Sequence, residues 1–107
     1  MTKQTTFKRE TVKQFSRPLT LEPNVSAIGE FIRTDTVPAE KSPNNTEYLI
    51  HIFESETGEF FHVTGKYFDD IDFQVGNYYE INFVGQMTTK KGNRFNAYNI
   101  FKLIAEK

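Results

Sequence analysis

The chain has 107 residues and a formal net charge of −1, and this length suits one domain with a single hydrophobic core. It contains no cysteine, which excludes both a disulfide framework and a zinc site built from thiolates. No apolar run approaches membrane-spanning length, and the first ten residues lack the apolar centre of a signal peptide. We therefore expect a soluble, cytoplasmic protein that makes no membrane contact.

Charged and aromatic residues are unevenly distributed along the chain. Residues 1–24 hold five Lys or Arg against two Glu, whereas the remainder is acidic overall. Such asymmetry can leave one basic surface on an acidic protein, so the net charge does not exclude a nucleic-acid partner. The chain also has 11 Phe and 5 Tyr, and most of these rings fall in the segments expected to be strands.

The first third of the chain predicts an arm, a strand and a loop. Residues 1–24 include the proline-containing stretch RPLTLEPN, which disfavours helix and indicates an extended basic arm with a short strand near Thr20–Leu21. Residues 25–34 predict a strand, in which Gly29 suits a bulge that lets the strand curl. Residues 34–45, TDTVPAEKSPNN, predict a long polar loop.

Residues 47–65, EYLIHIFESETGEFFHVTG, predict a β-hairpin whose two faces differ. Directly opposed residues of an antiparallel pair share a face, so the alternation around the turn sorts the side chains. The expected core face pairs Ile50 with Val63 and Ile52 with Phe61. The expected solvent face pairs His51 with His62 and Phe53 with Phe60. Two phenyl rings and two imidazoles on a solvent face indicate a binding surface.

The last third of the chain predicts one irregular segment and two strands. Residues 66–77 suit a short helical turn, and residues 78–89 alternate strongly, with Tyr79, Ile81 and Phe83 inward and Gly85 at a bend. KKGN is a turn, and residues 94–105 form the last strand. Five mostly antiparallel strands with an insertion between the third and fourth predict an all-β, five-stranded OB-fold barrel, of Greek-key type, over residues 25–107. A small β-sandwich is the alternative.

The stretch GNYYEINFVGQMTTKKGNRFNAYNIFKL resembles the final hairpin of single-stranded DNA-binding proteins, with a basic turn between two strands. Together with IGEFIR and the hairpin, the chain from about Val25 resembles a phage-encoded single-stranded DNA-binding protein of the OB-fold family. The resemblance implies a function in DNA replication or recombination, in the host cytoplasm. Bacterial relatives end in an acidic tail that recruits partner proteins, whereas this chain ends KLIAEK, so recruitment through such a tail is not expected.

The resemblance implies a platform for single-stranded DNA, or alternatively RNA. Flat side chains stack on bases of any identity, and each stack contributes roughly 1–3 kcal/mol. We expect the loops of the barrel to supply phosphate contacts, including Lys41. The expected stacking residues are His51, Phe53, Phe60 and His62, extended by Phe31 and Arg33. The expected phosphate contacts are Lys90, Lys91 and Arg94.

Other functions fit parts of the same pattern. The aromatic face could equally dock a protein, including a second copy of the chain, or stack on a carbohydrate. The two histidines could hold a metal only with a third ligand such as Asp69, Asp70 or Asp72, at a spacing that is not typical of zinc. No catalytic nucleophile, base or phosphate-binding loop is recognisable, so neither an enzyme nor a cofactor is expected.

Overall fold

The computed structural model describes residues 6–7 and 15–105, in which six strands form one sheet. The strands are β1 (Arg17–Pro18), β2 (Ser26–Val37), β3 (Tyr48–Ser55), β4 (Phe60–Thr64), β5 (Tyr78–Thr88) and β6 (Arg94–Leu103). A 3-10 turn, η1 (Ala39–Lys41), and one short helix, α1 (Lys66–Asp69), complete the described elements. The predicted all-β class and the predicted helical turn are confirmed.

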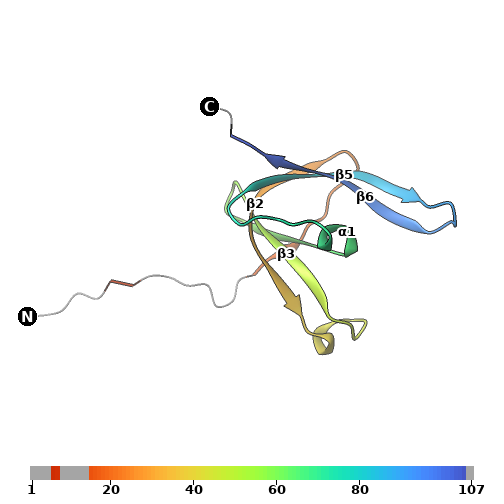
Figure 1. The fold of residues 1–107 in the computed structure, drawn as a ribbon, viewed down its shortest axis with the longest axis horizontal. Coiled ribbons are helices and arrows are strands. Elements are labelled where there is room, and N and C mark those ends of the chain that lie inside the picture. Colours follow the sequence, from red (N-terminus) through yellow and green to blue (C-terminus); the bar gives the residue numbers. More distant parts are fainter. Residues whose placement is uncertain (1–5, 8–14, 106–107) are drawn as a thin grey trace, which may run out of the picture.

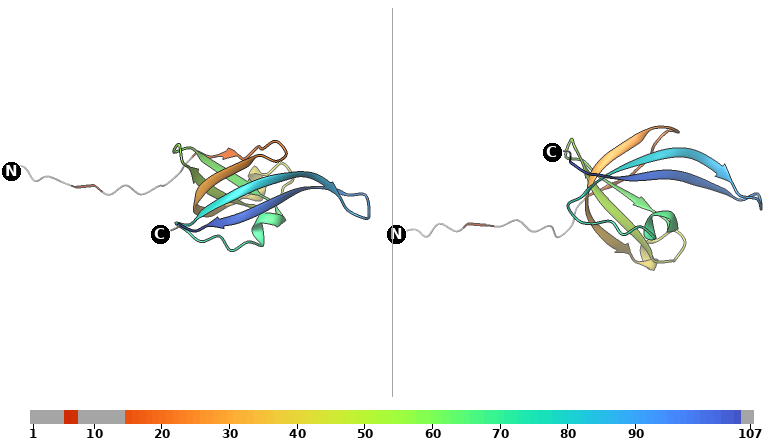
Figure 2. Two further views of the ribbon diagram at one scale, coloured as in Figure 1. Left: turned by 90° about the horizontal axis from the view of Figure 1, so that it is seen from above. Right: turned by 45° about the horizontal axis from the view of Figure 1, so that its top comes forward.

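The sheet curls into a half-barrel, and its strand order is β1-β4-β3-β2-β5-β6 (Figures 1 and 2). All neighbours are antiparallel except β1, which pairs parallel with β4 and adds a sixth strand to the expected five. The expected first strand near Thr20–Leu21 lies instead at Arg17–Pro18. Most of the predicted basic arm, including Lys3, Lys8, Arg9 and Lys13, lies outside the described residues.

The hairpin of β3 and β4 is shifted by one residue from the expected register. His51 pairs with Val63, Ile52 with His62 and Phe53 with Phe61. The reason is the turn, in which Ser55 and Glu59 close a loop of three residues that ends in Gly58 at φ +85°. A three-residue loop with glycine in the left-handed region is a common hairpin connection, and it fixes this register. The side chains of His51 and Phe53 therefore share the inner face with Phe61 and Val63.

The core lies on the inner face of the curled sheet and is largely aromatic. Phe53 packs between Phe61 at 5.4 Å, Phe73 at 5.1 Å and Phe31 at 5.4 Å, measured between ring centroids. Tyr79 and Ile81 point inward as predicted. Ring contacts at these distances add to the free energy gained by burying the rings. The buried cluster consists of Phe31, Phe53, Phe61, Val63, Phe68, Phe73, Tyr79 and Ile81.

Two irregularities in register bend the long strands. The pairing of β5 with β6 shifts between Phe83 and Gly85, where Gly85 has φ +133°, and this confirms the predicted bend. The pairing of β2 with β3 shifts between Phe31 and Arg33, so the bulge in this strand is not at Gly29 as expected. The strand also continues to Val37, which shortens the predicted loop to residues 38–47.

Gly29 has a packing function instead. A Cβ at this position would lie 2.9 Å from the Phe61 ring and 3.0 Å from the Phe53 Cβ. We expect Gly29→Ala to lower the free energy of unfolding by about 1–3 kcal/mol, because the buried rings cannot move away without strain. Urea denaturation measures this change, with Thr36→Ala on the exposed part of β2 as the control. Equal stability of the two variants would contradict the close approach.

Candidate nucleic-acid interface

Three of the residues expected on the solvent platform are buried in the core. Phe53 is 0% exposed, and Phe31 and His51 are each 4% exposed. The shifted register places Phe53 and His51 on the inner face, and the bulge after Phe31 separates this ring from Arg33. A ring buried on all sides cannot stack on a ligand, so the expected role of these three residues in binding is wrong.

His51 joins the short helix to the sheet. Its Nε2 lies 2.8 Å from Oδ1 of Asp69, and its Nδ1 lies 2.9 Å from Oγ1 of Thr34. Both polar atoms of a buried imidazole are thus satisfied, as a stable interior requires. His51 and His62 point to opposite faces of the hairpin, so the alternative in which both histidines bind one metal ion is also wrong.

Phe60 and His62 remain on the outer face of β4, and His62 lines a groove there. The larger part of the groove, about 590 Å³, lies between β4 and the loop of residues 38–47, and Tyr48 and His62 both line it. A smaller part, about 200 Å³, continues toward β6 and reaches Asn96 and Tyr98. The two parts share Pro18, His62 and Thr64 and therefore adjoin one another at β4.

His62 forms part of the wall at the centre of this groove. Its Nδ1 lies 2.8 Å from the Ser16 Oγ, and its backbone carbonyl accepts a hydrogen bond of 2.9 Å from the Leu19 N–H. Partial burial lowers the pKa of His62 below its ordinary value of 6.5, because desolvation disfavours the charged ring. His62 therefore offers an uncharged, flat ring at neutral pH, which suits contact with a base better than contact with a phosphate.

Aromatic residues that the sequence did not single out form the far end of the groove. Tyr98 lies 4.9 Å from Phe68 and 5.2 Å from Phe83 between ring centroids, and the Tyr67 hydroxyl donates a hydrogen bond to the Tyr98 carbonyl. Helix α1 thereby contacts the middle of the β5–β6 hairpin. Alternation along β6 predicts which residues share a face with Tyr98, but it does not predict which face of the sheet that is. The pairing of Tyr98 with Phe83 settles this.

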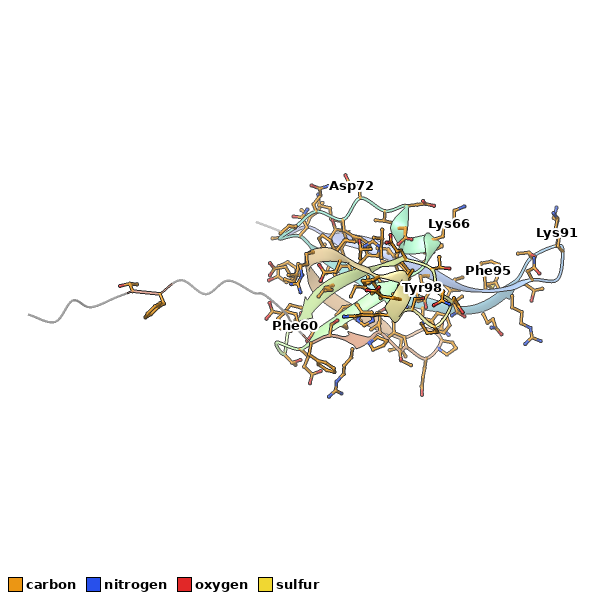
Figure 3. The ribbon with its side chains drawn as sticks, turned by 90° about the horizontal axis from the view of Figure 1, so that it is seen from below. Phe60, Lys66, Asp72, Lys91, Phe95 and Tyr98 are labelled. Atoms are coloured by element: carbon orange, nitrogen blue, oxygen red, sulfur yellow. The ribbon has the colours of Figure 1, made fainter. Side chains whose placement is uncertain are left out.

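The predicted basic residues are exposed, but they do not form one cluster. Lys90, Lys91 and Arg94 lie at the tip of the β5–β6 hairpin, and Lys91 marks its far end in Figure 3. Lys41 is exposed in the loop that borders the larger part of the groove. Arg33 points to the outer face and lies 3.1 Å from the Asp35 carboxylate, which neutralises part of its charge. Lys41 therefore lies beside the larger part of the groove, whereas Lys90, Lys91 and Arg94 project beyond it at the hairpin tip.

Neither the family models, nor the curated proteins, nor the solved structures include a significant match to this chain. No helix in the part of the chain that the structure describes is long and apolar enough to cross a membrane.

Proposed function

We propose that this protein binds single-stranded DNA, with little sequence preference, in the groove on the outer face of β3 and β4. The observation that carries the proposal is the groove lined by Tyr48, His62 and Tyr98, with Lys41 in the loop that borders its larger part. Flat side chains in a groove with flanking positive charge are what sequence-tolerant binding of a single strand needs. Such binding protects single strands in replication or recombination.

The proposal includes an OB-fold, formed by the five strands β2 to β6. The order β4-β3-β2-β5-β6, with α1 between β4 and β5, agrees with that topology, and β1 is then the end of the N-terminal arm. In an OB-fold the ligand crosses the second and third strands between two loops. Here those strands are β3 and β4, and the loops are residues 38–47 and 89–93.

The basic tip of the β5–β6 hairpin supplies one test. Replacing Lys90, Lys91 and Arg94 by alanine is expected to weaken binding of all single strands about equally, because phosphate contacts carry no sequence information. The slope of log affinity against log salt concentration should fall by ~0.7 for each lost phosphate contact. Fluorescence anisotropy with oligo-dT at several salt concentrations measures the slope.

Lys102→Ala is the matched control, because Lys102 is exposed on the same strand, β6, but at the end opposite the hairpin tip. This variant should keep the slope of the unmodified protein. An unchanged slope in the triple variant would mean that the hairpin tip makes no phosphate contact. The bound DNA would then lie elsewhere on the protein.

Protein interaction is a second candidate, favoured by a separate surface of exposed rings and carboxylates on the outer face of β2, β5 and β6. Ile28, Glu80 and Phe101 lie in one row across these strands, and Glu30, Tyr78 and Leu103 in the next. Tyr78 is 47% and Phe101 51% exposed, and a hydrogen bond to the Glu30 carboxylate raises the pKa of the Tyr78 phenol. An acidic surface with exposed rings does not suit a nucleic acid but suits a protein, including a second copy of the chain. Analytical ultracentrifugation tests for that copy.

A further inference from the structure

A third depression lies beside the groove, at the beginning of β4. It has a volume of about 210 Å³ and is lined by Phe15, Arg17, Glu59 and Phe60. Phe60 stands at this end of the sheet in Figure 3. Two residues come from the end of the N-terminal arm and two from the hairpin turn and β4, so distant parts of the sequence build one small site.

Backbone and side-chain hydrogen bonds hold the arm against β4 at this point. Arg17 and Pro18 pair with Phe61 and His62, and the flanking Ser16 and Leu19 both bond to His62. These contacts fix the backbone on the C-terminal side of Phe15 and on both sides of Arg17. The backbone that carries Arg17 and Phe60 is therefore positioned by the fold before any ligand arrives, which reduces the entropy lost on binding.

Within the described residues, the side chains that line the depression make no ring contact or ion pair with one another. Phe15 is 76% exposed, and among the described residues neither Phe15 nor Phe60 stacks on another ring. No ion pair joins Arg17 to Glu59 in the described part of the chain. Two apolar rings beside one carboxylate and one guanidinium suit a flat ligand with hydrogen-bond donors and acceptors on its edge.

Among the nucleic-acid bases, guanine fits this set of groups best. Its N1–H and N2–H₂ groups lie side by side, so a carboxylate can accept from both, while its O6 and N7 are the preferred acceptors for arginine. Thymine offers a carboxylate only one N–H. Stacking between aromatic side chains, with hydrogen bonds to the base edge, is how proteins commonly read an unstacked base.

We propose that the depression formed by Phe15, Arg17, Glu59 and Phe60 binds a single guanine base of a DNA strand whose other bases lie in the groove. This inference rests on the proposed function and adds to it one position with a base preference. Glu59 selects the base through its edge, Arg17 contacts O6 or N7, and the two phenyl rings contact its faces.

The test compares oligo-dT with the same oligonucleotide carrying one central dG. The unmodified protein is expected to bind the dG-containing strand about tenfold more tightly, an effect typical of one good bidentate contact. Glu59→Gln should abolish this preference, because glutamine cannot accept from both guanine donors. Glu56→Gln is the matched control, since Glu56 is exposed in the same turn but does not line the depression.

Each result decides the matter. Loss of the dG preference in Glu59→Gln, with the preference kept in Glu56→Gln, supports the guanine site. Equal affinity for both oligonucleotides, or a preference that persists in Glu59→Gln, overturns the guanine site and leaves the proposed function standing. Absence of binding to either oligonucleotide overturns both.

Discussion

Phe53→Ala is expected to lower the free energy of unfolding by about 3–5 kcal/mol, the range for removing a buried phenyl ring. Phe53 is 0% exposed, and its ring contacts those of Phe31, Phe61 and Phe73. Removing it leaves a cavity that the stacked rings around it cannot fill. Since small domains are stable by only about 5–15 kcal/mol, the loss should be visible as a large fall in the midpoint of urea denaturation.

Phe60→Ala is the control, because Phe60 is the neighbouring aromatic position of the same hairpin but lies half-buried on the outer face. We expect a loss of no more than about 1.5 kcal/mol for this variant, since less apolar area is removed from the interior. If Phe60→Ala destabilised the protein as much as Phe53→Ala, the observed register of β3 and β4 would be wrong.

Much of the fold could be predicted because the strands have clear boundaries. The start of β5 and its inward residues Tyr79 and Ile81 were predicted correctly, because alternation in this segment is strong. Gly85 marked the bend. The short helix between β4 and β5 was also predicted. The two-residue strand β1 was misplaced, because its pairing with β4 depends on tertiary contacts and leaves no periodic pattern in the sequence.

The hairpin register could not be predicted from alternation, because both of its faces are apolar. Ile50 and Ile52 on one side and His51 and Phe53 on the other give similar patterns, and a shift by one residue exchanges the two sets. The segment Glu56–Gly58 carried the information that decides between them, as a three-residue loop ending in glycine.

The candidate site was predicted only in part, because an irregularity in strand pairing changes which face a side chain occupies. Phe31 and Arg33 are two residues apart and were expected on one face, but the bulge between them turns Phe31 inward and Arg33 outward. Phe60, His62 and the basic hairpin tip remain accessible. Tyr48 and Tyr98 were not singled out, because their position in the groove depends on how the 38–47 loop and β6 approach β4.

We expect this protein to bind single-stranded DNA far more tightly than double-stranded DNA. The groove is lined by the rings of Tyr48, His62 and Tyr98, which can stack on the faces of unpaired bases, and paired bases in a duplex do not expose those faces. The described residues include no helix longer than the four residues of α1, so no helix is available to enter a major groove. The loss of two stacking contacts at ~1.5 kcal/mol each corresponds to roughly a 100-fold weaker affinity for duplex DNA.

Titration of oligo-dT and of a matched duplex of equal length, followed by fluorescence anisotropy at two salt concentrations, separates stacking on unpaired bases from contact with phosphates alone. We expect the affinity for oligo-dT to be at least ~100-fold above that for the duplex and to fall as salt rises, and we expect Tyr48→Ala to bind oligo-dT more weakly. Equal affinity for single and double strands, or no binding to oligo-dT at low salt, would show that the protein does not bind single-stranded DNA by stacking in the groove.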